Sequence, residues 1–177
     1  MSRGFVKEDD QEEPPFIPPR APLPDGVPNH VTPRGLHLLH QERDELEKAR
    51  GDAINDTSLA DYDRRRTIAE LDGRLALLQE RIVTARVAEP DGKEPVDVRF
   101  GCTVIFRPHD GPQAGIERSF TLVGVDEANV KEGRIAFTAP LARALMGKRV
   151  GEWADLKLGG SDQRIEVLAI AGAQSFP

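Results

Sequence analysis

Three aspartates and three arginines lie close together near the middle of this 177-residue sequence. They are Asp56, Asp61, Asp63, Arg64, Arg65 and Arg66. Exposed carboxylates suit a hard cation such as Mg²⁺, which takes few protein oxygens and keeps several of its waters. Guanidinium groups bind phosphates through paired hydrogen bonds. Together these groups could complete a metal and phosphate site that a partner already holds.

The same residues also have a simpler interpretation. Aspartate is common in turns and at helix starts, and the three arginines could form a solvated face that pairs with Asp61 and Asp63. Because these acids are expected to be exposed, the sequence predicts no tight metal site formed by this chain alone. We therefore expect no intrinsic cofactor, and a Mg²⁺ ion would be shared with a partner.

A hydrophobic heptad pattern flanks the charged cluster and indicates how it is positioned. Apolar residues alternate at spacings of three and four downstream of it, and compatible spacings occur upstream. They are Ile68, Leu71, Leu75, Leu78, Ile82 and Ala85, and upstream Leu36, Leu39, Leu46 and Ala53. Pairing the two series about a point between Ala60 and Asp61 predicts an antiparallel coiled-coil hairpin with the charges at its apex.

Cap signals give the bounds of these helices. Thr32 is a good N-cap and Pro33 suits the first helical position, so we expect the first helix to run to about Ile54, roughly 33 Å. The second helix should begin between residues 58 and 61 and end near Val87, before a linker at residues 90–92.

The pattern changes beyond residue 96 to short β-type runs separated by turns. Expected strands cover 103–107, 120–125, 134–138, 153–158 and 164–170, with a short helix at 140–146 and a turn at 159–160. The sequence therefore predicts an α+β protein in three parts. These are an extended or disordered proline-rich arm at 1–29, the hairpin at 30–89 and a compact domain at 90–177. The arm is either a solubilising tail or a strap that docks on a partner.

Composition limits the classes of function. The formal net charge is −6, which argues against strong independent binding to duplex DNA because that requires a concentrated cationic face. No apolar stretch approaches membrane-spanning length and no signal-peptide region opens the chain, so we expect no membrane partner. A single cysteine excludes an intramolecular disulfide framework and fits a reducing cytoplasm. We expect a monomer.

Several long motifs, in order, resemble one known family, the Gre-type bacterial transcription elongation factors. These are VTPRGL at 31–36, VRFGCTV at 98–104, VGVDEA at 123–128, GRI at 133–135 and APLARALMGK at 139–148, followed by VG at 150–151. The resemblance covers roughly residues 30–172 and leaves out the proline-rich arm.

The resemblance implies a coiled coil followed by an FKBP-like domain. Such factors bind RNA polymerase at its secondary channel through the C-terminal domain. Acids at the coiled-coil tip then help to hold a catalytic Mg²⁺ while the polymerase cleaves backtracked RNA. Carried over to this chain, Asp56 and Asp61 are the candidate catalytic acids. The candidate contacts to the nascent RNA 3′ end are Arg64, Arg65 and Arg66, and those to polymerase are Asp126, Glu127, Ala139 and Pro140.

The tip departs from the pattern of the cleaving members, Gly-Asp-x-Ser-Glu-Asn-Ala-(Asp/Glu)-Tyr. Residues 55–62 read NDTSLADY. Asp56 matches the first acid and Asp61 the last, but the Glu-Asn element is absent and Leu59 stands nearby. The first helix is also about three turns shorter than in typical members of the family it resembles. Three functions therefore stay open, none of them an enzyme acting on RNA by itself. They are an elongation factor that stimulates cleavage, a non-cleaving channel regulator and, more remotely, an FKBP-like prolyl isomerase or chaperone.

Overall fold

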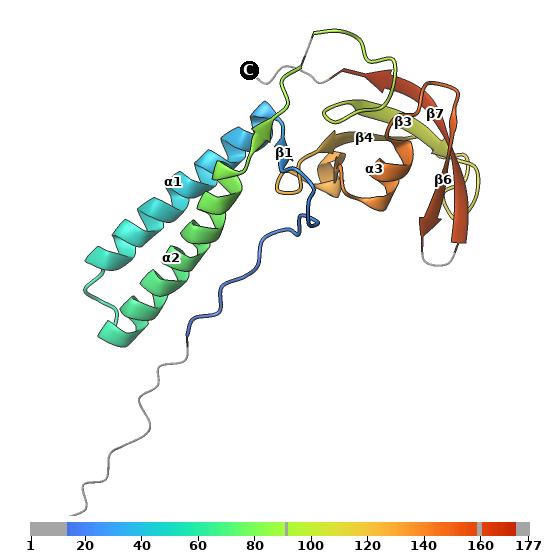
Figure 1. Cartoon of the computed structure of the whole chain (residues 1–177). Helices are drawn as coiled ribbons and strands as arrows, with labels where there is room; N and C mark the ends of the chain where they lie inside the picture. The colour runs from blue at the N-terminus through green and yellow to red at the C-terminus, as the bar shows by residue number, and fades with distance from the viewer. Residues whose placement is uncertain (1–13, 91, 159–160, 173–177) are drawn as a thin grey trace, which may run out of the picture.

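A computed structural model describes residues 14–90, 92–158 and 161–172. Two helices form an antiparallel hairpin, and a curled five-stranded sheet with one short helix follows (Figure 1). The elements are β1 His30–Val31, α1 Pro33–Asn55, α2 Asp61–Val83, β2 Arg86–Val87, β3 Thr103–Pro108, β4 Arg118–Val123, η1 Val130–Glu132, β5 Arg134–Ala136, α3 Pro140–Leu145, β6 Trp153–Leu158 and β7 Ser161–Ala171. The α+β fold class and the N-terminal helical hairpin are confirmed.

The hairpin is held by the apolar residues that the heptad pattern singled out. Leu39, Leu46, Ala53, Leu71 and Leu78 are buried in one cluster, and the other seam residues pack around it. Arg50 lies beside this seam and pairs with Asp72 of the opposite helix at 2.5 Å. At 23 residues each, the helices make a rod of roughly 34 Å.

The start of α1 is confirmed, but the predicted end of α2 is wrong by about a turn. Thr32 caps α1 by accepting a hydrogen bond from the Gly35 N–H. Helix α2 ends at Val83 rather than near Val87 because the Asn29 amide hydrogen-bonds to the Arg81 carbonyl at 2.8 Å. The chain then pairs as β2 with β1 in a parallel two-stranded ladder.

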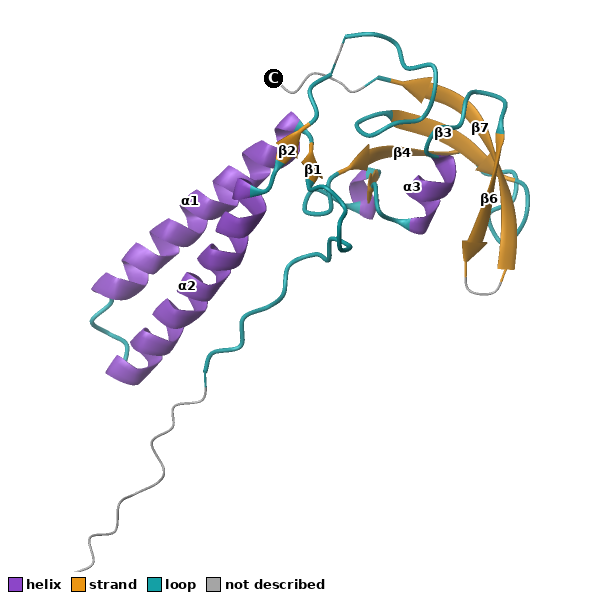
Figure 2. Cartoon of the chain, in the orientation of Figure 1, coloured by secondary structure: helices purple, strands orange, loops and turns teal. Residues whose placement is uncertain are grey.

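The sheet has the strand order β5-β4-β3-β7-β6, with β4 and β5 parallel and the other neighbours antiparallel. Figure 2 shows α3 under its curled face, where Ala142 and Leu145 are fully buried among Val104, Phe106 and Leu122. Two strands end earlier than predicted. Strand β4 stops before Gly124 and β5 stops at Ala136, in both cases because the chain turns there.

Some predictions fall outside the described residues: the first part of the arm (1–13), the turn at 159–160, and residues 173–177. The described residues contain no helix long and apolar enough to cross a membrane.

Candidate functional site

The charged tip is the loop that joins the two helices. Asp56 is the C-cap of α1 and Asp61 is the first residue of α2. Figure 1 shows the tip at the end of the hairpin remote from the sheet. Asp61 and Asp63 lie in the first turn of α2. Their negative charges therefore stabilise the N-terminus of this helix by interacting with the helix dipole. The tip acids thus have a local structural role beside any functional one.

The Asp56 carboxylate is fixed by Ser58. Its Oδ1 accepts hydrogen bonds from the Ser58 hydroxyl at 2.5 Å and from the Ser58 N–H at 2.8 Å. These bonds, the hydroxyl first, hold the pKa of Asp56 below its ordinary value. A further hydrogen bond from the Leu59 backbone acts in the same direction. Asp56 is therefore ionised at neutral pH and held in one orientation.

Asp61 is paired with an arginine of its own helix. The Arg64 guanidinium lies 2.5 Å from the Asp61 carboxylate and also reaches the Asp56 carbonyl at 3.5 Å. Arg65 and Arg66 are exposed. Of the three arginines, Arg64 therefore braces the tip itself, and Arg65 and Arg66 face the solvent.

Neither the tip nor any other part of residues 14–90, 92–158 and 161–172 gathers three or more His, Cys, Asp or Glu side chains that could hold a metal. A cation at the tip would need most of its ligands from a partner. Three large apolar side chains, Ile54, Leu59 and Tyr62, are exposed around the same loop at 47%, 38% and 41%. The tip therefore offers a partner apolar contact area as well as charge.

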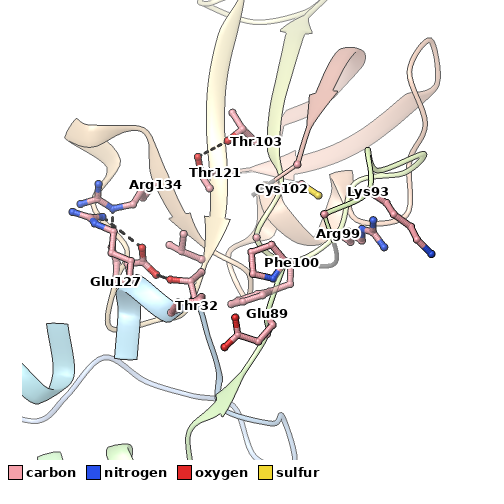
Figure 3. A pocket seen from close by; sticks show the side chains of 18 of the residues that line it. Thr32, Glu89, Lys93, Arg99, Phe100, Cys102, Thr103, Thr121, Glu127 and Arg134 are labelled. Carbon is pink, nitrogen blue, oxygen red and sulfur yellow. Dashed lines mark hydrogen bonds and ion pairs between the residues drawn. The ribbon is translucent and has the colours of Figure 1, made fainter. Parts of the chain in front are cut away.

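Glu127 lies at the junction between the hairpin and the C-terminal domain. Its carboxylate accepts a hydrogen bond from the Thr32 hydroxyl at 2.5 Å (Figure 3). The Arg34 guanidinium lies 3.5 Å from the same carboxylate. Gly35 makes this approach possible, because a Cβ there would lie 2.8 Å from Glu127 Oε2. Gly124 similarly allows the domain to approach the His30 carbonyl, which an added Cβ would meet at 2.7 Å.

Asp126 joins the same junction from the other side. Its carboxylate lies 2.9 Å from Arg20 of the arm and 3.0 Å from Arg81 of α2, and its side chain is only 9% exposed. The structure thus places both predicted polymerase contacts, Asp126 and Glu127, in bonds within the chain. Contact with a partner stays a prediction for them.

The other two predicted polymerase contacts open α3. Ala139 is its N-cap and half-buried, whereas Pro140 is exposed. Further along the motif, Ala142 and Leu145 are core residues. The exposed residues of this motif are Pro140, Arg143 and Gly147, so only Pro140 of the two predicted contacts is open to a partner.

An open cavity of about 910 Å³ lies beside the Glu127 junction. Figure 3 shows Phe100, Cys102, Thr103 and Thr121 along it. Phe100 is the single aromatic residue among the described residues that line it.

Comparison with known proteins identifies the chain. The family described as "Transcription elongation factor, GreA/GreB, C-term" matches residues 93–172. Transcription elongation factor GreA of Acidiphilium cryptum is 32% identical over 138 residues, which span 76% of this chain and 86% of that protein. GreA of Thermodesulfovibrio yellowstonii is 33% identical over 161 residues, or 84% of this chain and 99% of its own length.

The chain belongs to the GreA/GreB family.

Solved structures of related proteins are also similar. The GreA factor homolog 1 (Gfh1) of Thermus thermophilus is 23% identical, with a TM-score of 0.36, and the alignment covers 82% of this chain and all of that one. A GreA/GreB factor from Nitrosomonas europaea is 20% identical, with a TM-score of 0.37 and coverages of 80% and 98%.

Within this GreA/GreB member, several contact residues were not foreseen from the sequence. Ser58 had a usable signal, since a serine two residues after an aspartate can close a side-chain turn. Gly35 in the first turn of a helix was a second signal, because it indicates close approach of another group. Arg20 and Arg81 gave no signal, since their shared partner Asp126 is 106 residues from Arg20.

Proposed function

We propose that this GreA/GreB member binds bacterial RNA polymerase through its C-terminal domain, inserts the hairpin into the secondary channel and modulates elongation. The observation that carries the proposal is the rod of two packed 23-residue helices, which presents a charged tip remote from the C-terminal domain. It acts in the cytoplasm with the polymerase and has no catalysis of its own.

Within this function, stimulation of RNA cleavage is supported by Asp56. An ionised, oriented carboxylate on a narrow tip can add a ligand to a Mg²⁺ ion that the polymerase holds. Arg65 and Arg66 are exposed near it and suit the phosphates of the nascent RNA 3′ end. Arg64 is the third candidate and is paired with Asp61.

A second candidate is a regulator that occupies the channel without cleavage. It is favoured by the ion pair between Asp61 and Arg64, which withdraws that acid from a metal, and by Leu59, an exposed apolar residue at the tip. In this case the tip would contact the channel through Ile54, Leu59 and Tyr62 rather than act on the metal.

A transcript-cleavage assay on stalled polymerase separates the two candidates. Wild type is compared with the double variant Asp56→Asn and Asp61→Asn. The control is Asp63→Asn, which removes one negative charge from the same tip. Cleavage lost in the double variant and kept in Asp63→Asn establishes stimulation by the two acids. Wild type that binds polymerase and alters elongation without cleavage establishes the regulator. No binding by wild type contradicts the proposal as a whole.

The prolyl isomerase alternative is weakly supported. Phe106 and Phe120 stack on each other within the core, Trp153 pairs with His109 elsewhere, and one aromatic side chain lines the large cavity. A peptide isomerisation assay should show no acceleration over the uncatalysed rate.

A further inference from the structure

The described part of the arm, residues 14–29, runs alongside the hairpin without helix or strand (Figure 2). Ile17 packs against Gly73 of α2, where even one added Cβ would collide with it. Farther along, the Ala21 carbonyl accepts a hydrogen bond from Arg81, and the Asn29 amide bonds to the end of α2. The arm is therefore attached to α2 at several points along its length.

Arg20 connects the arm to two more parts of the molecule. Its guanidinium makes two hydrogen bonds of 2.9 Å to the two carboxylate oxygens of Glu42 on α1. It also donates to Asp126 Oδ1 of the C-terminal domain, from Nε at 3.1 Å and from Nη2, which is shared with Glu42, at 2.9 Å. One side chain thus bridges the arm, the hairpin and the C-terminal domain.

The environment of this bridge makes it a strong one. The side chains of Arg20 and Asp126 are only 18% and 9% exposed. Arg81, at 12%, forms an ion pair with the second oxygen of Asp126 at 3.0 Å but makes no hydrogen bond to it. Burial lowers the pKa of Arg20, but its bonds to Glu42 and Asp126 outweigh this and raise it. Charged hydrogen bonds shielded from water are stronger than exposed ones.

The geometry also explains why such a bridge is useful. The hairpin meets the C-terminal domain at its base, through Thr32 with Glu127 and through His30 beside Gly124. Contacts confined to the base would leave the domain free to pivot. Glu42 lies ten residues farther along α1, roughly 15 Å from the base, so a contact there braces the rod against rotation.

We propose that the arm is a strap that fixes the angle between the hairpin and the C-terminal domain, with Arg20 as the residue that joins all three parts. The strap sets the direction in which the tip points. This inference rests on contacts within the chain, so it does not depend on the proposed action on polymerase.

Distance measurements by pulsed electron paramagnetic resonance test the strap on the full chain without polymerase. Spin labels are placed on the exposed positions Ala76→Cys of α2 and Lys157→Cys of β6, since the native Cys102 is 3% exposed. In this labelled background, Arg20→Ala removes the bridge and Gly73→Ala displaces Ile17 without changing any charge. The matched controls are Arg43→Ala, whose guanidinium pairs with Asp44 and Glu47 of its own helix, and Gly51→Ala, which has open space for a Cβ.

We expect one narrow distance distribution in the wild type and in both controls. Arg20→Ala should broaden it or add a second maximum, and Gly73→Ala should act in the same direction. Far-UV circular dichroism should match wild type, because Arg20 lies outside the helices and strands. If Arg20→Ala and Gly73→Ala both keep the wild-type distribution, the strap does not fix the angle and the proposal is wrong.

Discussion

At the scale of single residues, the tip is a place where local hydrogen bonds decide the state of the charges. Asp56 is oriented by Ser58, and Asp61 is held by Arg64. Two acids that look equivalent in the sequence therefore differ in what they can offer a partner. Asp56 has one carboxylate oxygen fixed by its own loop, whereas Asp61 must exchange an ion pair before it can bind a metal.

The Ser58 bonds predict a specific titration of Asp56. A carboxylate that accepts hydrogen bonds has a lowered pKa, so its bonds to Ser58 are present above the ordinary aspartate pKa of about 3.9. They are lost as the pH falls through the lowered pKa of the folded state. We expect Ser58→Ala to raise the pKa of Asp56 toward its ordinary value, as measured by NMR titration of its carboxyl carbon.

Thr57→Ala is the control for this titration, because Thr57 is an exposed hydroxyl residue of the same loop. It should leave the Asp56 midpoint unchanged. Equal midpoints in wild type and Ser58→Ala would show that the Ser58 hydroxyl does not set the pKa.

Two glycines of α1 give a second prediction at this scale. In Gly35→Ala the new Cβ would press on Glu127 Oε2 and strain its bond to Thr32, so we expect a loss of about 1–3 kcal/mol in the free energy of unfolding. Gly51→Ala, with open space around it, should gain about 0.5–1 kcal/mol from helix propensity alone. Urea denaturation of both variants checks the opposite signs, and a stabilised Gly35→Ala would contradict close packing at the junction.

At the scale of elements, the hairpin depends on its apolar seam. Leu78 is fully buried there, so Leu78→Ala should cost about 2–5 kcal/mol, the usual range for truncating a buried leucine. Leu59→Ala at the exposed tip should change stability by less than about 0.5 kcal/mol. Chemical denaturation followed by far-UV circular dichroism measures both, and similar costs at the two positions would contradict a role for Leu78 in holding the seam together.

The elements also show where local sequence signals stop being sufficient. The start of α1 is fixed by Thr32 and Pro33, which act within the first turn, and the prediction there was right. The end of α2 is set by Asn29, which is 52 residues away from the Arg81 carbonyl it binds. A pattern of neighbouring residues cannot report such a distant hydrogen bond.

At the scale of the whole molecule, the junction between hairpin and C-terminal domain depends on Asp126. Asp126→Asn would leave Arg20 and Arg81 largely buried without their shared charge, and we expect a loss of about 1.5–3 kcal/mol. Hydrogen–deuterium exchange should become faster in the arm and at the end of α2. Asp52→Asn, which breaks an exposed ion pair with Lys48, should leave these amides unchanged. Protected arm amides in Asp126→Asn would contradict the role of the Asp126 carboxylate.

The sequence by itself determined the hairpin, the charged tip and the family. Periodicity, caps and contiguous motifs are local properties, and they need only neighbouring residues to act. The tertiary structure alone decided that Asp126 and Glu127 bond within the chain and that residues 14–29 of the arm lie on α2. Each of these depends on where side chains meet after folding, as when Arg20 reaches Asp126 across 106 residues of sequence.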